Sequence, residues 1–168
     1  MLNICDLKGL YKHGLRELYS GVVQAAVVLP TLATSIESVQ LQGLVEQQAA
    51  QAAKHQLRLA AVLTVHGALD YSVADPAVAA LLRSAESFTA QVGDADLRDA
   101  ALLSVLRRVM HYEVVACAVI VGHAKALSLA IDRHTLIAML GEARATERDL
   151  ADLEGEINQV ALTVSVPA

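Results

Sequence analysis

Four long stretches of this chain carry apolar residues at steps of three and four, which is the spacing of one face of an α-helix. They run from about Asp6 to Ala33, from Ser38 to Val65, from Asp94 to Leu127 and from Asp132 to Ile157. The composition agrees, because hydrophobic residues make up 55% of the chain and aromatic ones only 3%, whereas sheets rely on aromatic and β-branched residues. We therefore expect an all-α protein.

The connection between the second and third stretches contains a further helical signal. Residues 67–75 interrupt the helical spacing, and Asp75 followed by Pro76 is typical of an N-cap and the first residue of a helix. A short helix is therefore predicted to begin there and to end before Gly93. Four long helices with one long crossover, which holds a short extra helix, are the plan of a four-helix bundle.

Two helix ends are less regular than the rest. Pro30 lies near the end of the first stretch, where it either kinks the last turns or marks the exit of the helix. After residue 160, apolar and small or polar residues alternate with a period of two, which predicts an extended segment. We therefore expect one helical bundle over residues 1–160 and an extended C-terminal tail over residues 161–168.

Charge and hydropathy exclude several classes of protein. The net charge of −5 without a cluster of Lys and Arg argues against nucleic acid as the main partner. The longest uncharged runs, residues 21–36 and 114–122, are interrupted or too short to cross a membrane. The chain shows no signal peptide, and Cys5 and Cys117 are too far apart for a redox motif. A cytoplasmic protein with no membrane partner is expected.

Polar side chains that the helical spacing turns inward are the candidate site. They are Gln48, Gln51, His55, Glu113, Glu142 and Glu147. Inward carboxylates on the helices of a bundle, with ExxH pairs on two of them, can hold two iron or manganese ions. Hard cations need several oxygen ligands, and this set has too few carboxylates for a full dinuclear centre. Glu113 is therefore interpreted either as a metal ligand or as a charged residue that lies at the edge of the bundle or is hydrogen-bonded to Gln or His across the core.

Several short motifs resemble those of the YciE/YciF family of ferritin-like bacterial stress-associated proteins. The similarity extends from about Asp6 to Ala161. The motifs are Leu18-Tyr19-Ser20 with Gln24, Leu29-Pro30, the run Leu97 to Leu102, His111-Tyr112-Glu113, Ala145-Thr146-Glu147 and Ile157-Asn158. The resemblance implies a ferritin-like bundle, commonly dimeric, whose typical members carry a dinuclear iron or related centre and have no well-established reaction.

The same resemblance implies that this chain lacks part of that centre. Four positions where members of the family have glutamate hold other residues here, namely Val22, Gln51, Met110 and Ala143. Three carboxylates do match the family pattern, namely Glu113, Glu142 and Glu147. His55 falls where members have Gln or His. Because three of the four replacements are apolar, we expect a filled core in place of a complete metal centre.

Three functional hypotheses follow. The first is a non-catalytic, stress-associated structural or interaction protein with no cofactor, which forms a homodimer or a hetero-oligomer with a related bundle. The second keeps iron or manganese at a residual site of His55, Glu113, Glu142 and Glu147, with iron storage or peroxide-linked oxidation. The third concerns residues 162–165, which resemble the C-terminal segments that dock ferritin-like cargo inside encapsulin shells.

Overall fold

The part of the protein that the structure describes consists of five α-helices and the segments that connect them. The computed structural model describes residues 4–70 and 73–163, and this part of the chain contains no strand. The helices are α1 (Leu7–Ala33), α2 (Val39–Val65), α3 (Pro76–Gln91), α4 (Ala95–Ala126) and α5 (Ala130–Ala161). The predicted all-α class is confirmed, and α3 lies in the crossover where a short helix was expected.

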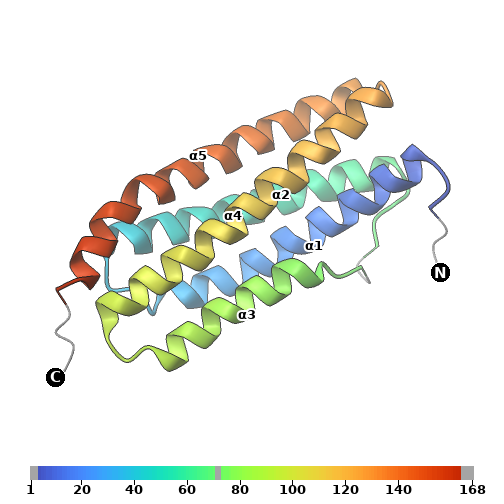
Figure 1. Cartoon of the computed structure of the whole chain (residues 1–168). Coiled ribbons are helices and arrows are strands. Elements are labelled where there is room, and N and C mark those ends of the chain that lie inside the picture. The colour runs from blue at the N-terminus through green and yellow to red at the C-terminus, as the bar shows by residue number, and fades with distance from the viewer. Residues whose placement is uncertain (1–3, 71–72, 164–168) are drawn as a thin grey trace.

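The helices form two antiparallel hairpins that pack side by side. One hairpin is α1 with α2, the other is α4 with α5, and α3 packs outside the bundle against α1 and α4 (Figure 1). The apolar stripes meet in one core, with fully buried leucines at Leu15, Leu59 and Leu106. Within the described residues, no helix combines the length and hydropathy needed to cross a membrane.

Side-chain caps start four of the five helices. Asp6, Ser38, Asp75 and Asp94 each accept a hydrogen bond from a backbone N–H group in the first turn of the helix that follows. The predicted cap at Asp75 is confirmed, with Pro76 as the first helical residue. These caps explain why the helix starts could be predicted closely from the sequence.

The last helix was predicted to begin at Asp132 with this residue as its cap, and this prediction is wrong. Helix α5 begins earlier, at Ala130, and its N-cap residue Leu129 has no side-chain hydrogen bond. Asp132 lies in the first turn and is only 7% exposed. Its carboxylate accepts a hydrogen bond from the Tyr11 hydroxyl at 2.8 Å and lies 2.5 Å from Nε2 of His66. These two partners in the other hairpin hold the carboxylate inside the bundle, so it cannot cap the helix.

Two other helix ends differ from a simple reading of the pattern. Pro30 lies inside α1, which continues to Ala33, so the proline does not mark the exit of the helix. Helix α5 continues to Ala161, with a backbone hydrogen bond from Leu162 to Asn158, so the expected extended tail does not begin at residue 161. The alternating sequence pattern begins inside α5, and the helix continues through its first residues because no Gly or Pro interrupts it there. Residues 164–168 of the predicted tail lie outside the described residues.

A second buried aspartate ties the hairpins together at the other end of the bundle. Asp99, near the start of α4, is 2% exposed. Its carboxylate accepts hydrogen bonds from the backbone N–H groups of Glu37 at 3.2 Å and Ser38 at 2.7 Å, in the connection between α1 and α2. Asp132 connects the hairpins where α5 begins, and Asp99 connects them where α4 begins. Each accepts hydrogen bonds from groups of the other hairpin.

Candidate functional site

His55 on α2 is the centre of a charged cluster that joins three helices. Its side chain is 1% exposed, and each ring nitrogen faces a carboxylate. Nδ1 lies 3.0 Å from Oε1 of Glu113 on α4, and Nε2 lies 2.9 Å from Oε2 of Glu142 on α5. An imidazolium ring donates from both nitrogens, so the protonated form of His55 satisfies both carboxylates at once. The cluster therefore links α2 to both helices of the other hairpin.

Arg58 extends the cluster to the surface. It lies one turn after His55 on α2, and its Nη1 is 2.8 Å from Oε1 and 2.9 Å from Oε2 of Glu142. Arg58 and Glu142 are each a little over one-third exposed, whereas Glu113 is 14% exposed. Two cations and two carboxylates give the cluster no net charge when His55 is protonated. Such compensation is what makes charges tolerable inside a protein.

The surroundings favour the charged forms of His55 and Glu142. Burial lowers the pKa of His55, but hydrogen bonds and negative charge from Glu113 and Glu142 outweigh it, so this pKa lies above its ordinary value. Burial raises the pKa of Glu142, but Arg58 and His55 outweigh it, so this pKa lies below its ordinary value. Both shifts favour an ion-paired cluster near neutral pH.

These opposite shifts predict how the cluster responds to pH. Because the folded pKa of His55 is raised, its stabilising contribution is complete below its ordinary pKa of 6.5 and is lost as the pH rises through the folded value. Because the folded pKa of Glu142 is lowered, its contribution is complete above 4.5 and is lost as the pH falls through the folded value. We expect the cluster to stabilise the fold most between these two ordinary values.

Urea unfolding of the wild type and His55→Gln across the pH range measures this dependence. The difference in free energy of unfolding should be largest in the mildly acidic window and should shrink towards alkaline pH, because neutral His55 no longer attracts the carboxylates. A difference that stays constant into the alkaline range would mean that the charge of His55 does not stabilise the fold.

Buried glutamine and methionine side chains continue the core beside the cluster. Gln48 is 2% exposed, and its Nε2 donates to Sδ of Met110. Its Oε1 is buried and has no hydrogen-bond partner among the residues that the structure describes. Oε1 of Gln51 accepts a hydrogen bond from the Thr146 hydroxyl at 3.4 Å. The predicted inward orientation of Gln48 is thus confirmed. This part of the core holds neutral amides and a thioether in place of carboxylates.

Glu147 is separate from the cluster. It faces His111, whose Nδ1 lies 2.6 Å from Oε1 of Glu147, and the His111 side chain is 69% exposed. Of the four candidate ligands predicted from the sequence, the structure brings His55, Glu113 and Glu142 into contact, whereas Glu147 contacts His111 at the surface. Arg58 was missed by the sequence argument, although its place one turn after His55 on the same helix was a usable signal.

The contacts within the cluster determine which ligands it could offer to a metal ion. Both ring nitrogens of His55 face carboxylates, and Arg58 occupies both oxygens of Glu142. Among residues 4–70 and 73–163, no group of three or more His, Cys, Asp or Glu side chains is arranged to hold a metal ion. Val22, Met110 and Ala143, where the family resemblance implies glutamate, are buried and apolar. The donor set is one of direct ion pairs.

The Cys117 thiol, also in the core, is poorly suited to nucleophilic chemistry. It is 2% exposed and donates to the backbone carbonyl of Leu136. Burial, with a smaller effect from the charge of Glu113, raises its pKa to about 12.

Two helical hairpins joined by a long crossover, with polar side chains converging at mid-bundle, define a ferritin-like four-helix bundle protein. The family DUF892, described as a domain of unknown function, matches residues 6–162. Because the match covers most of the sequence, the chain belongs to this family.

Solved structures confirm the fold. The E. coli stress protein YciF is 22% identical, with a TM-score of 0.86 over 92% of this chain and 98% of that one. YcfI, a proposed structural protein from Rhodopseudomonas palustris, is 23% identical, with a TM-score of 0.82 over 98% of both chains. No curated protein matches the sequence. The resemblance to the YciE/YciF family that the motifs indicated is thereby confirmed.

Proposed function

We propose that this chain is a non-catalytic, stress-associated protein of the ferritin-like class that acts as a structural or interaction protein, with direct ion pairs in place of a dinuclear metal centre. The observation that carries this proposal is His55, whose two ring nitrogens both face carboxylates across the bundle. The description of YciF as a stress protein and that of YcfI as a proposed structural protein support the same class of function.

The shape of the core supports a role without catalysis. Val22 is 1% exposed and Met110 is fully buried, and both fill space beside the charged cluster. The cavity lined by Val22 and Glu113, between α1, α3 and α4, has a volume of about 10 Å³. Such a volume is enough for one water molecule. A substrate therefore has no room on this side of the ion pairs.

The outer surface of α4 has exposed apolar residues that suit an interface with a partner. Val115 and Val119 lie one turn apart on this helix and are 49% and 52% exposed. Together with the buried Val114 and Cys117 they make the middle of α4 apolar on most of its circumference. We propose that the protein works as a homodimer, or with a related bundle, in the cytoplasm.

Metal analysis of the purified protein tests the proposal. The chain should be produced in medium supplemented with iron and manganese, purified without chelator and analysed by plasma mass spectrometry. We expect well under one metal ion per chain, because the ion pairs leave no open ligand set. About two equivalents of iron or manganese per chain, the content of a dinuclear bundle, would contradict the proposal.

A residual metal site is the second candidate, favoured by the meeting of His55, Glu113 and Glu142. Iron or manganese at this point would support iron storage or peroxide-linked oxidation. Iron binding and peroxide turnover should then fall in Glu113→Ala and remain normal in Glu147→Ala, because Glu147 is not in contact with His55. If Glu113→Ala left both properties unchanged, this candidate would be excluded.

Cargo docking through the C-terminus is the third candidate. Leu162, which follows α5, is 76% exposed, so the start of the segment is available to a partner. Co-expression with an encapsulin shell, with and without residues 159–168, compares the loading directly. Equal loading of both forms would remove this candidate.

A further inference from the structure

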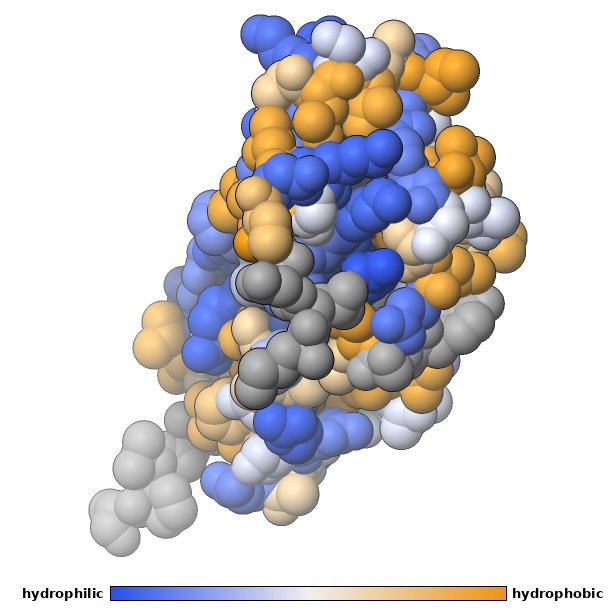
Figure 2. All heavy atoms as spheres, turned by 90° about the vertical axis from the view of Figure 1, so that its right-hand side faces the viewer, coloured by the Kyte–Doolittle hydropathy of each residue, from blue (hydrophilic) through white to orange (hydrophobic). Residues whose placement is uncertain are grey.

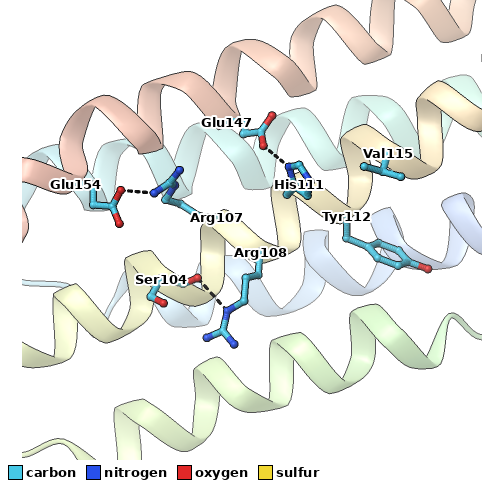
Figure 3. A pocket seen from close by; sticks show the side chains of 8 residues that line it. All are labelled: Ser104, Arg107, Arg108, His111, Tyr112, Val115, Glu147 and Glu154. Atoms are coloured by element: carbon cyan, nitrogen blue, oxygen red, sulfur yellow. Dashed lines mark hydrogen bonds and ion pairs between the residues drawn. The ribbon is translucent and has the colours of Figure 1, made fainter.

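A surface groove runs along α4 beside α5, on the outside of the bundle. It has a volume of about 560 Å³, which is within the usual range for sites that bind small molecules. All the side chains that line it come from these two helices. Figure 3 shows their arrangement, with Glu147 and Glu154 on α5 and the remaining side chains on α4.

Both carboxylates of the groove are already paired. Glu147 faces Nδ1 of His111 at 2.6 Å, and Glu154 forms an ion pair with Arg107. These two contacts hold the α5 wall against α4, as the dashed lines in Figure 3 show. They leave the groove without a free acidic group among its lining residues. The groove is therefore not built to receive a cation.

Arg108 is the cation of the groove that has no carboxylate partner among the described residues. Its Nε donates to the backbone carbonyl of Ser104 at 3.1 Å, one turn earlier on α4. This bond fixes the side chain while its two terminal nitrogens form no ion pair. In Figure 3 the guanidinium group stands apart from both carboxylates of α5. A planar guanidinium with free terminal N–H groups is suited to bidentate recognition of an oxyanion.

A neighbouring donor also lacks an acceptor. Nε of Arg107 is buried and has no hydrogen-bond partner within the described part of the chain. This atom is shielded from the groove, so Arg107 adds positive charge beside Arg108 but offers no accessible Nε–H there. Arg108 is therefore the group of the groove that can receive an oxygen acceptor.

The other end of the groove is apolar. Tyr112 lies one turn after Arg108, and its hydroxyl is already committed to Asp75 at 2.8 Å, so the ring is what it offers to the groove. Val115 follows and is 49% exposed. Seven residues of helix separate Arg108 from Val115, a length of about 10 Å. This is the size of a small organic molecule.

We propose that the groove binds a small organic anion. A single carboxylate or phosphate group would lie on the guanidinium of Arg108, and an apolar or aromatic body would lie along Tyr112 and Val115. The site is separate from the His55 cluster, because no residue of that cluster lines the groove.

Titrations followed by ¹H–¹⁵N correlation spectra test this site on the whole chain. The probes are phenyl phosphate and phenylacetate, which share the proposed chemistry, and 2-phenylethanol and inorganic phosphate, which each keep one half of it. The variants are Arg108→Gln and, as a matched control, Arg133→Gln, an exposed arginine on α5 that does not line the groove. Thermal unfolding confirms that both variants remain folded.

We expect at least one of the two aromatic anions to shift backbone amides from Ser104 to Val115 in the wild type and in Arg133→Gln. In Arg108→Gln its affinity should fall by about tenfold or more, because a charge-assisted bidentate contact is lost. The stronger of the two probes identifies the anionic group that the groove prefers. Three results would overturn the proposal: equal affinity in both variants, equal binding of 2-phenylethanol, or equal binding of inorganic phosphate, which would indicate an adventitious ion only.

Discussion

His55→Ala is expected to lower the free energy of unfolding by about 3 kcal/mol, near the lower end of what the loss of one partner from a buried ion pair costs. His55 is 1% exposed and Glu113 is 14% exposed, so the substitution leaves the Glu113 carboxylate in the core without its donor. Glu142 still pairs with Arg58 and is over one-third exposed, so the loss of its contact with His55 adds little to the destabilisation. Chemical unfolding in urea near neutral pH measures the change.

Two further variants separate the charge from the packing. The double variant His55→Leu with Glu113→Leu removes both members of the buried pair and should be clearly more stable than His55→Ala, because no carboxylate is left without a partner. Arg58→Gln, which loses only an exposed pair, should change the free energy of unfolding by less than about 1 kcal/mol. If His55→Ala were no more destabilising than Arg58→Gln, the buried pair would not contribute as described.

Asp75→Ala should also destabilise the protein strongly, by about 3 kcal/mol. Asp75 is 1% exposed and accepts from the backbone N–H groups of Ala77 at 2.9 Å and Val78 at 3.1 Å. It also accepts from the Tyr112 hydroxyl at 2.8 Å. Loss of an N-cap costs about 1 kcal/mol, and a partly buried hydroxyl left without its acceptor costs about 1–3 kcal/mol more.

Asp94→Ala is the matched control for this variant. Asp94 caps α4 in the same way but is exposed and accepts a single hydrogen bond, from the backbone N–H of Leu97 at 3.0 Å. It should cost only about 1 kcal/mol, the ordinary effect of a cap. Equal losses in the two variants would show that the contact between Asp75 and Tyr112, which attaches α3 to α4, contributes nothing to stability.

The helices were predictable because their signals are local. Apolar residues at helical spacing, and caps such as Asp75 before Pro76, are read along the chain without knowledge of the fold. The prediction that the last helix begins at Asp132 was wrong for a physical reason. The partners of this residue, Tyr11 and His66, lie in the other hairpin, and an interaction over such a distance in sequence leaves no local pattern. The same holds for Asp99, which lies in a motif used for the family resemblance but whose binding of two backbone N–H groups the sequence did not reveal.

The candidate site was predictable in part. Helical spacing turned His55 and Glu113 inward, and both are in the core cluster. Spacing gives the face of a helix but not the height at which two helices meet, so it could not separate Glu142, which contacts His55, from Glu147, which contacts His111. Nor could it show that Arg58 would pair with Glu142. That pairing bears directly on whether a metal ion could be bound.

The buried aspartates at the two ends of the bundle also determine how the hairpins are aligned along their common axis. Leucine-rich faces can slide past one another by a turn and still remain buried, but Asp99 reaches Glu37 and Ser38 only in one alignment, and Asp132 reaches Tyr11 only in the same one. A shift by a single residue, about 1.5 Å, would strain the contacts at both ends together. Apolar packing brings the two hairpins together, but it allows several axial registers. The carboxylates of Asp99 and Asp132 select one of them, because both sets of hydrogen bonds form only in that register.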